Sequence, residues 1–388
     1  MPSSPSEALT AELRARITEA GGLPFAEFMA ACLYHPDFGY YMTPRQRIGK
    51  GGDFFTSTSV HAVFGRLIAR QLAQMAELLG GDSFQIVEQG AGEGHLALDI
   101  LDALRDEAPQ LHARLSYSLV EVGPESRARQ AQRLAAHAER VTWCAPDAWK
   151  IESGCFLSNE LVDAFPVHVV RKVDGALREL YVVNKNDAGF AEEWREPSTP
   201  GLEDHLRWLG VAPIGGNRAE VNLAAPVWMR QVGGRIEKGF VITIDYGYPA
   251  TELYAPHRRD GTLLCYRQHQ ADDDPYSAAG EKDITTHVDF TALQQAGAEA
   301  GLATLWFGEQ YRFLLALGFV EELIRLQERC ADEREARALR LTLKHLIVPE
   351  QGMGETFKVL VQGKGVGAPE LLCARRLSAL SLGGFPGM

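Results

Sequence analysis

Hydrophobic residues recur every three or four positions in two stretches near the start of the chain. Residues 7–34 predict two helices with a break at residues 21–24, and residues 60–79 predict a third helix that ends at Gly80. Between them lies a loop, residues 35–59, in which aromatic residues stand among glycines. Such a loop is unlike a random linker, because the glycines make its backbone permissive, and it is not a P-loop, because the spacing of Gly, Lys and Ser/Thr is wrong.

From Ser83 onward, short apolar runs alternate with amphipathic stretches of helical period. The apolar runs predict strands, and the stretches between them predict helices. The strands are expected over 84–88, 117–122, 141–144 and 155–158, and the helices over 96–107 and 125–138. This series is typical of a parallel, doubly wound α/β sheet, so we expect a Rossmann-like core.

The pattern changes after Pro166. Two runs in which apolar and polar residues alternate flank Asp174-Gly175. This pattern is a strong signal for a β-hairpin turn. Further elements are predicted as a helix over 219–238, a strand over 239–245, helices over 290–300 and 313–343, and a strand over 356–362. Two long stretches, 184–216 and 247–288, show few regular signals and are interpreted as insertions.

The chain has 388 residues, enough for two or three domains or for one enlarged domain. We expect an N-terminal helical region with the glycine-rich loop at 1–82, an α/β domain at 83–364 that carries both insertions, and a tail at 365–388. The hydrophobic share of 46% can fill a large core and rules out disorder over the whole chain.

The formal net charge of −12 argues against a nucleic-acid partner, since phosphate binding requires a basic face. The six cysteines include no CxxC pair, so neither a zinc ribbon nor a dithiol redox site is predicted. No apolar run approaches the roughly 18 residues that cross a bilayer. The first twenty residues contain three glutamates and lack the pattern of a signal or transit peptide, so the expected location is the cytoplasm.

The first candidate site is a glycine turn between the first predicted strand and its helix. Glu88 is followed by Gly90, Gly92 and Gly94, and His95 occupies the position where a dinucleotide fingerprint requires glycine. The E-x-G-x-G-x-G pattern is instead typical of S-adenosylmethionine (SAM) methyltransferases, in which the glutamate faces the ammonium group of the ligand. A tight turn without a ligand is the alternative.

Three further candidate positions follow the next two strands. Glu121 ends the second strand, where a carboxylate can accept both ribose hydroxyls of a nucleoside. Asp147 and Ala148 follow the third strand, where an acidic side chain could bind the adenine amino group. The alternative for Glu121 is a solvated charge at the end of a strand. The alternative for Asp147 is a turn residue that binds no ligand.

The fourth strand leads into Asn159, Glu160 and Asp163, at the sheet edge where reacting groups lie in open α/β folds. The Asn/Asp-Pro-Pro-Tyr/Phe motif of adenine-amino methyltransferases is missing here, because the chain lacks its prolines. Glu160 or Asp163 could instead hold a guanidinium group through two hydrogen bonds. Capping of a helix start by Asn159 and acidic first-turn residues is the alternative.

The segment 283–290 contains Asp283, His287 and Asp289, which permit either an acid–base pair or metal ligation. Because no further Cys or His stands at ligand spacing, we expect no metal site. His287 is kept as a candidate proton acceptor, and loop scaffolding is the alternative for the whole segment.

Taken together, these residues resemble the MidA family of SAM-dependent methyltransferases, which includes the mitochondrial complex I assembly methyltransferase and bacterial homologues. The resemblance extends over most of the chain. It rests on 34–41 (YHPDFGYY), 52–57 (GDFFTS), Phe64-Gly65, the glycine turn, 119–122 (LVEV), 159–166 (NELVDAFP), 244–247 (IDYG), 261–269, 283–290 (DITTHVDF), and 353–360.

Two departures from the family pattern stand out. Ala91 occupies a position where proline is expected, which is a mild change. Thr58-Ser59 stand where Pro-Glu is expected, so a carboxylate is missing from the loop that is expected to face the substrate. The identity of the substrate is therefore less well predicted than that of the cofactor.

The resemblance implies a seven-stranded methyltransferase sheet with added helices and loops that form a substrate cover. SAM is the implied cofactor, bound by Glu88, Gly90, Gly92, Gly94, Glu121, Asp147, Ala148 and Asn159. The implied catalytic residues are Glu160, Asp163 and His287, and the implied substrate loop contains Gly52, Asp53, Phe54 and Thr56. The mitochondrial member methylates an arginine of a complex I core subunit, so the expected partner is the homologous NADH:quinone oxidoreductase subunit.

Two other functions remain open from the sequence. A small-molecule methyltransferase would use the two insertions as lids on a closed pocket. A non-catalytic assembly factor would keep the fold and bind partner surfaces. The glycine spacing disfavours a nicotinamide oxidoreductase, and the sequence does not predict the oligomeric state.

Overall fold

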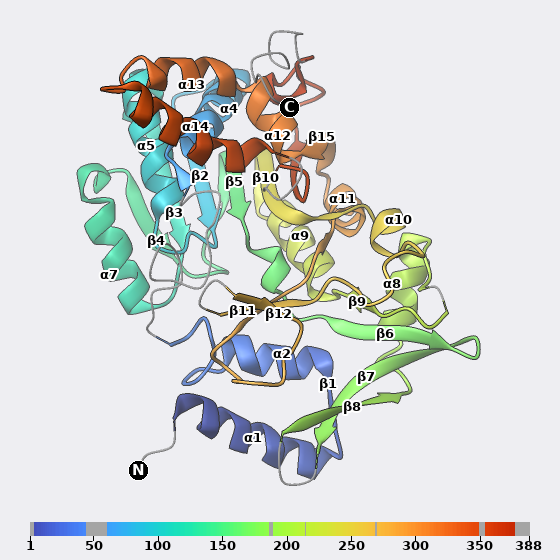
Figure 1. The fold of residues 1–388 in the computed structure, drawn as a ribbon. Helices are drawn as coiled ribbons and strands as arrows, with labels where there is room; N and C mark the ends of the chain where they lie inside the picture. Colours follow the sequence, from blue (N-terminus) through green and yellow to red (C-terminus); the bar gives the residue numbers. More distant parts are fainter. Residues whose placement is uncertain are drawn as a thin grey trace. The chain divides into compact units, whose positions relative to one another are not determined.

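The computed structural model describes most of the chain, in six segments (Figure 1). These are residues 4–43, 60–185, 189–213, 215–267, 270–348 and 354–376. The described residues group into two compact units. The hairpin unit lies within Met1–Phe54, Val162–Met229 and Gly247–Ala296, and the sheet unit within Phe55–Leu161, Arg230–Tyr246 and Gly297–Met388. The predicted domain boundaries at residues 82 and 364 stay a prediction.

The sheet unit is built on a largely parallel sheet. In spatial order its strands are β15 (Ala303–Glu309), β16 (Phe357–Lys364), β10 (Ile236–Tyr248), β5 (Ile151–Asn159), β2 (Phe84–Gln89), β3 (Leu115–Val120) and β4 (Val141–Cys144). The strands from β10 to β4 are parallel neighbours, whereas β16 is antiparallel to both β10 and β15. The predicted parallel, doubly wound sheet is therefore confirmed, with one antiparallel strand inserted near its edge.

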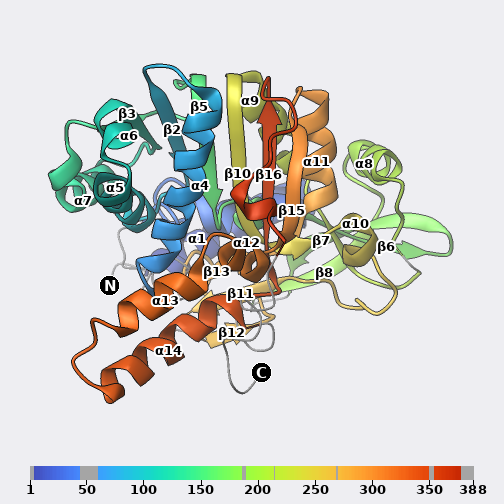
Figure 2. The same cartoon turned by 90° about the horizontal axis from the view of Figure 1, so that it is seen from above.

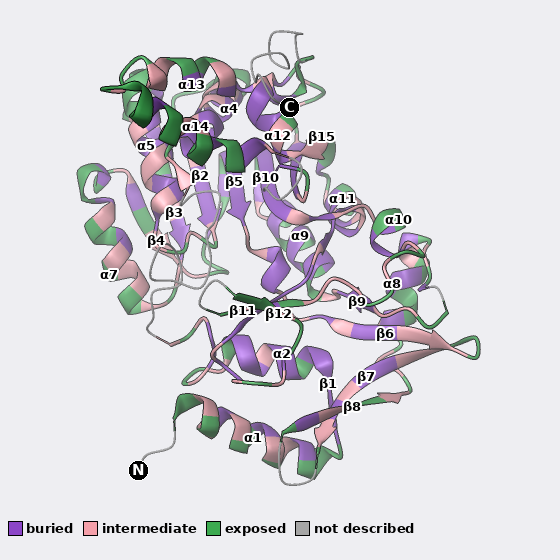
Figure 3. Cartoon of the chain, viewed as in Figure 1, coloured by how far each residue is buried: buried purple, intermediate pink, exposed green. Residues whose placement is uncertain are grey.

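Side-chain alternation along the central strands explains why helices cover the sheet. Leu157 on β5 and Ile242 on β10 belong to one apolar core, while Phe156 and Val241, their neighbours along the chain, point to the other face and are also buried. Figure 3 shows these strands buried along most of their length. Strands that are buried on both faces read as continuous apolar runs, which is why the sequence predicted them.

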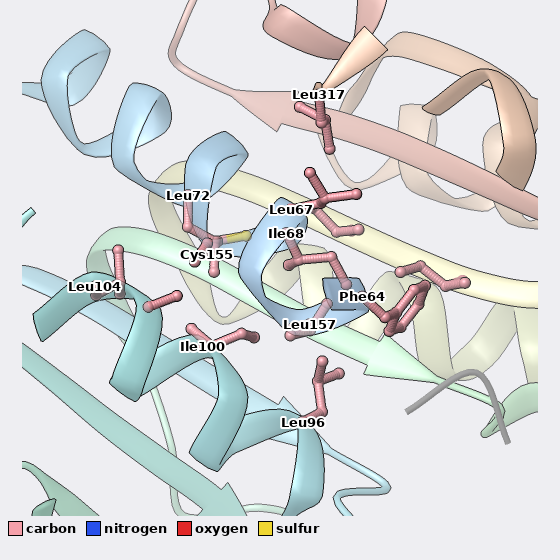
Figure 4. Close-up of a cluster of buried hydrophobic side chains, with 14 of the residues drawn as sticks. Phe64, Leu67, Ile68, Leu72, Leu96, Ile100, Leu104, Cys155, Leu157 and Leu317 are labelled. Carbon is pink, nitrogen blue, oxygen red and sulfur yellow. The ribbon is translucent and has the colours of Figure 1, made fainter. Parts of the chain in front are cut away.

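Helices α4 (Val63–Leu79) and α5 (His95–Glu107) pack on the first face of the sheet (Figure 2). Their apolar side chains recur at helical spacing and meet those of β5 in Figure 4: Phe64, Leu67, Ile68, Leu72, Leu96, Ile100, Leu104, Cys155 and Leu157. The two helices approach closely at Gly65, where an added Cβ would lie 2.4 Å from the Cβ of Asp99. Only glycine fits this helix crossing.

Helices α12 (Gln310–Ala316), α13 (Phe319–Gln327) and α14 (Glu333–Ile347) add to the same core. The sequence predicted one long helix here. The helix is broken at Gly318, whose φ of 94° is unfavourable for other residues, and α14 starts anew at Asp332, which accepts a hydrogen bond from the Glu335 N–H at 2.8 Å.

The hairpin unit contains the predicted β-hairpin. Strands β6 (His168–Val173) and β7 (Ala176–Asn184) are antiparallel, and both turn residues between them have positive φ, 49° at Asp174 and 83° at Gly175. The sheet is extended by β1 (Leu23–Pro24), β8 (Phe190–Arg195) and β9 (Ala219–Val221). Helices α1 (Pro5–Ala20) and α2 (Phe25–Tyr34) pack apolar residues into this unit's core, and the predicted break between them is confirmed.

Several elements differ from the sequence prediction. The stretch 184–216 was predicted to be irregular but contains β8 and the amphipathic helix α8 (Gly201–Leu209). The helix predicted over 219–238 is shorter: α9 spans Ala224–Gly234 and lies between β9 and β10. These segments are short, so the apolar periodicity extends over too few residues to define their type.

Smaller elements complete both units. The stretch 247–288 contains α10 (Ala250–Leu253) and a small antiparallel sheet of β11 (Leu264–Arg267), β12 (Gln270–Asp272) and β13 (Asp283–Thr285). Strand β14 (Val288–Asp289) pairs with the end of β10 and leads into α11 (Phe290–Glu299). The remaining elements are α6 (Pro109–Arg114), α7 (Pro124–Arg133), η1 (Ala135–His137), η2 (Val162–Ala164) and η3 (Leu372–Ala374).

Within the described segments, no helix combines the length and apolarity that crossing a membrane requires. All six cysteines are free thiols. Burial raises the pKa of Cys32 and of Cys373 to about 12, so both are protonated at neutral pH.

Candidate cofactor site and catalytic loop

The glycine turn between β2 and α5 has a backbone that other residues rarely adopt. The φ values are 82° at Gly90, 53° at Gly92 and 81° at Gly94. Gly94 directly precedes α5, and no side chain of the described residues caps that helix start. The turn therefore offers backbone N–H groups and the positive end of a helix dipole.

The turn is fixed from outside by α7. The buried Gln130 amide donates to the carbonyl oxygen of Gly92 at 2.8 Å and accepts from the indole N–H of Trp143 at 2.8 Å. Arg133 donates to the carbonyl oxygen of Glu93 at 2.9 Å. Gln130 was not predicted from the sequence, because a single glutamine in an amphipathic helix carries no local signal of such a contact.

Glu88 lies near the end of β2 and is only 2% exposed. Burial raises the pKa of Glu88 to about 7, and a hydrogen bond of 2.8 Å from the Tyr117 hydroxyl acts in the opposite direction. A cationic partner would strongly stabilise the ionised form of this buried carboxylate. Tyr117 was also not identified from the sequence.

Glu121 follows β3, and its carboxylate is already oriented. One oxygen accepts the N–H groups of Val122 at 2.9 Å and Gly123 at 2.8 Å, which leaves the second oxygen for a ligand. Asp147 and Ala148 lie in the exposed turn after β4, where the Ala148 N–H donates to Ala145 at 3.0 Å. The structure thus brings all three residues to the ends of neighbouring strands.

Asn159 and Glu160 stand at the end of β5. Asn159 is buried; its amide nitrogen donates to Glu160 at 3.0 Å, and its amide oxygen accepts no hydrogen bond from the described residues. Glu160 has φ of 50°, which is rare for a residue with a side chain, and its N–H donates to Ile244 at 2.9 Å. Such strain is concentrated at functional sites.

Asp245 supports this turn from β10. It is fully buried, and one carboxylate oxygen accepts the N–H of Leu161 at 3.2 Å while the other accepts that of Tyr246 at 2.9 Å. Asp245 therefore links the ends of β5 and β10 just where Glu160 turns. Its place at a strand end was visible in the sequence, but its contact with Leu161 was not.

Asp163 and His287 belong to the hairpin unit. Asp163 lies in η2 and is 5% exposed, and its carbonyl oxygen accepts the N–H of Thr286 at 3.0 Å. The ring of His287 lies 5.3 Å from that of Tyr248. The structure therefore places Asp163 beside the segment that carries His287.

A carboxylate–tyrosine cluster accompanies Asp163 in that unit. The Tyr41 hydroxyl contacts both carboxylate oxygens of Asp283, at 2.8 and 2.9 Å, and the Tyr34 hydroxyl donates to Ala164 at 2.9 Å. Burial raises the pKa of Tyr41 well above its usual range, and the charges of Asp283 and Asp163 add to this effect. The predicted substrate-loop residues Gly52, Asp53, Phe54 and Thr56 lie outside the described residues.

The residues at the strand ends fit SAM. The glycine turn offers backbone donors, Glu88 suits a cation, and Glu121 has an oriented carboxylate. Asn159 has a buried oxygen that accepts no hydrogen bond within the described segments. No group of three His, Cys, Asp or Glu suited to a metal ion occurs in the described part of the chain.

The strand order, with antiparallel β16 between β10 and β15, and the glycine turn after the central strand β2 define a class I SAM-dependent methyltransferase. Residues 67–308 match the family model described as "Putative S-adenosyl-L-methionine-dependent methyltransferase". The chain belongs to this family, which is the MidA family that the sequence resembles.

Solved structures and curated relatives agree. A COG1565 superfamily member from Burkholderia thailandensis, bound to S-adenosyl-homocysteine, matches with a TM-score of 0.87 and 34% identity over 97% of both chains. The mitochondrial protein arginine methyltransferase NDUFAF7 homolog of Drosophila melanogaster is 30% identical, over 94% of this chain and 86% of its own length. Protein arginine methyltransferase NDUFAF7 of Danio rerio is 27% identical over 92% and 87%. SAM is therefore the cofactor of this chain.

Proposed function

We propose that this chain methylates an arginine side chain of a protein. The observation that carries the proposal is the strained Glu160 at the carboxyl end of β5. Carboxylates in this place suit a guanidinium acceptor, since they pair with its charge and geometry. The curated relatives that carry the name protein arginine methyltransferase support the same assignment.

The cofactor-binding residues have separate roles in this proposal. The glycine turn (Gly90, Gly92 and Gly94) holds the amino-acid end of SAM, while the Gly94 N–H closes the turn by donating to Ala91 at 2.8 Å. The ammonium group of SAM pairs with ionised Glu88. Glu121 accepts the ribose hydroxyls, and Asp147 with Ala148 contacts the adenine. Asn159 uses its buried amide oxygen for a ligand donor.

SAM supplies an activated methyl group, so the protein's task is to align, desolvate and charge-stabilise the acceptor. The lone pair of a guanidinium is delocalised, which makes its nitrogens weak nucleophiles. Glu160, and secondarily Asp163, offsets the positive charge and directs one nitrogen. His287 accepts the proton that the attacking nitrogen releases. The loop with Gly52, Asp53, Phe54 and Thr56 contacts the substrate.

The proposed partner is the NADH:quinone oxidoreductase subunit that corresponds to the complex I core subunit methylated by the mitochondrial member of the family. The support is the resemblance to that family together with the identity of 25–30% to several NDUFAF7 proteins over most of the chain. The carboxylates at the proposed acceptor site suit an arginine-containing segment of such a subunit.

The first test is isothermal titration with SAM and, separately, with NAD. Micromolar SAM binding that is lost in Gly92→Val is expected, because φ of 53° cannot accommodate a β-branched residue without strain. The second test incubates the protein with labelled SAM and the purified subunit, and locates the methyl group by mass spectrometry.

Glu160→Gln should reduce arginine methylation by about 10²-fold. The matched control is Glu152→Gln, an exposed glutamate at the other end of β5, which should leave the rate unchanged. Methylation of a small molecule in place of the subunit would favour the lid-covered methyltransferase. SAM binding without any transfer would favour the assembly factor.

A further inference from the structure

The hairpin unit contains a cavity of about 490 Å³, which is in the size range of ligand sites. We propose that this cavity binds a cationic, guanidinium-bearing side chain of the protein substrate, in addition to the arginine that is methylated. The inference deepens the proposed function and rests on it. It starts from the lining of the cavity, which includes His287, the candidate proton acceptor.

The carboxylates of the lining point to a cation. Asp260 and Asp273 line the cavity, are exposed, and have no hydrogen bond or ion pair with any residue that the structure describes. A buried third carboxylate, Glu220, accepts the N–H and the hydroxyl of Thr262 at 3.1 and 3.0 Å. Desolvation raises the pKa of Glu220. Its carboxylate is already engaged by Thr262, whereas the two aspartates are available to a ligand.

The arginines of the lining do not offer an anion site. Arg218 forms a two-pronged pair with Glu192, at 2.8 and 3.2 Å, and Tyr276 also donates to Glu192 at 2.9 Å. Arg258 contacts the Glu252 carbonyl at 3.0 Å and lies 4.1 Å above the Tyr248 ring. An anionic ligand would have to compete with the Glu192 carboxylate for Arg218, whereas a cation would not.

The cavity wall is built around a residue that must be glycine. Gly261 has φ of 78°, and an added Cβ would lie 2.0 Å from Glu220 Oε1. The hydroxyl of the next residue, Thr262, donates to Glu220 and accepts the His287 N–H at 3.0 Å. The wall that carries Asp260 is therefore tied to the backbone of His287.

The apolar part of the lining fits the stem of a long cationic side chain. Phe25 and Tyr276 contribute aromatic rings that pack 6.5 Å apart, nearly perpendicular to each other. Guanidinium groups favour aromatic faces next to carboxylates. The site thus selects for a second arginine in the substrate rather than for an acidic residue.

The test uses Nα-acetyl-arginine amide as the probe and Nα-acetyl-citrulline amide as its uncharged isostere, in saturation-transfer NMR titrations of the full-length protein. Wild-type protein should bind the arginine probe, and Asp260→Asn combined with Asp273→Asn should weaken binding about tenfold, as expected for two lost charge contacts. Asp82→Asn, an exposed aspartate of the sheet unit, is the control and should bind like wild type. Equal binding by all three proteins, or equal binding of the citrulline probe, would overturn the proposal.

A kinetic measurement separates this proposal from the proposed function. With the purified subunit as substrate, the double variant should raise KM about tenfold and leave kcat unchanged, because Asp260 and Asp273 are proposed to contact the second arginine and not the arginine that is methylated. An unchanged KM with normal methylation would overturn the cavity proposal alone. If the subunit is not methylated by any variant while the probe still depends on Asp260 and Asp273, the proposed function fails and the cation site stands.

Discussion

Replacing Glu88 by glutamine should make the free protein more stable above pH 7 and abolish cofactor binding. In the wild-type protein, burial raises the pKa of Glu88 from 4.5 to about 7. Between these values the unfolded chain has released the proton and the folded chain has not. The free energy of unfolding therefore falls as the pH rises from 4.5 to 7, and it stays lowered above 7.

The size of this effect follows from the two pKa values. A difference of one pKa unit between the folded and unfolded states corresponds to 1.36 kcal/mol. The ionised Glu88 therefore lowers the free energy of unfolding by about 3 kcal/mol above pH 7. Glutamine has nearly the same shape, and its carbonyl oxygen can still accept the hydrogen bond from Tyr117. Glu88→Gln should therefore remove most of the decline without leaving a cavity.

The assay is urea unfolding followed by tryptophan fluorescence, at half-unit steps from pH 5 to pH 8.5. The matched control is Asp289→Asn in the hairpin unit, where burial also raises the pKa of the carboxyl to about 7. Asparagine keeps the hydrogen bond from the Ala292 N–H. Both variants should show a flatter profile than wild type, but only Glu88→Gln should lose SAM binding in titration calorimetry.

Cofactor binding gives the second readout. Ionised Glu88 is proposed to pair with the SAM ammonium group, so the affinity of the wild-type protein for SAM should rise from pH 6 to pH 7.5, whereas Glu88→Gln should bind no SAM at either pH. If Glu88→Gln unfolds with the same pH profile as wild type, the desolvation argument is wrong. If it binds SAM normally, the assigned role of Glu88 is wrong, whatever the stability shows.

Three further predictions concern the turns at the strand ends. Gly90→Ala should lower the free energy of unfolding by about 1–2 kcal/mol in urea titrations, since φ is 82° and the new Cβ would lie 3.2 Å from Leu161; an unchanged value would contradict this. Gln130→Ala should weaken SAM binding about tenfold in calorimetry, because the Gly92 carbonyl loses its donor, and unchanged affinity would show that the turn is rigid by itself. Glu160→Gly should raise stability by roughly 1 kcal/mol or less while methyl transfer is lost; a loss of stability would show that Glu160 is not strained.

The parts of the site that the sequence predicted are those with a local cause. The positive φ values of Gly90, Gly92 and Gly94 need glycine, and the carboxylate of Glu121 is held by the two N–H groups that follow it. Such features depend on residues that are close together in the chain, so a sequence motif can predict them. The parallel sheet was predictable for a similar reason, because its buried strands are continuous apolar runs between amphipathic helices.

The supporting residues of the site have no local cause. Gln130 reaches Gly92 across 38 positions of the chain, and Asp245 reaches Leu161 across 84. These contacts depend on which strands are neighbours in the sheet, and the strand order is a property of the whole fold. The same holds for β15, whose seven residues are mostly half-buried and alternate too weakly to be distinguished from a loop.

Glu160 and Asp163 show how a short motif can have two structural roles. The residues are three positions apart, yet Glu160 belongs to the sheet unit and Asp163 to the hairpin unit. The chain turns between them through the positive φ of Glu160, and Asp245 holds the turn at the Leu161 N–H. Glycine would make this turn without strain, so the proposed function predicts that the glutamate is retained for its carboxylate. Glu160→Gly should therefore retain stability and lose activity. If Glu160 had only a structural role, its replacement by glycine would lower both stability and activity, or neither.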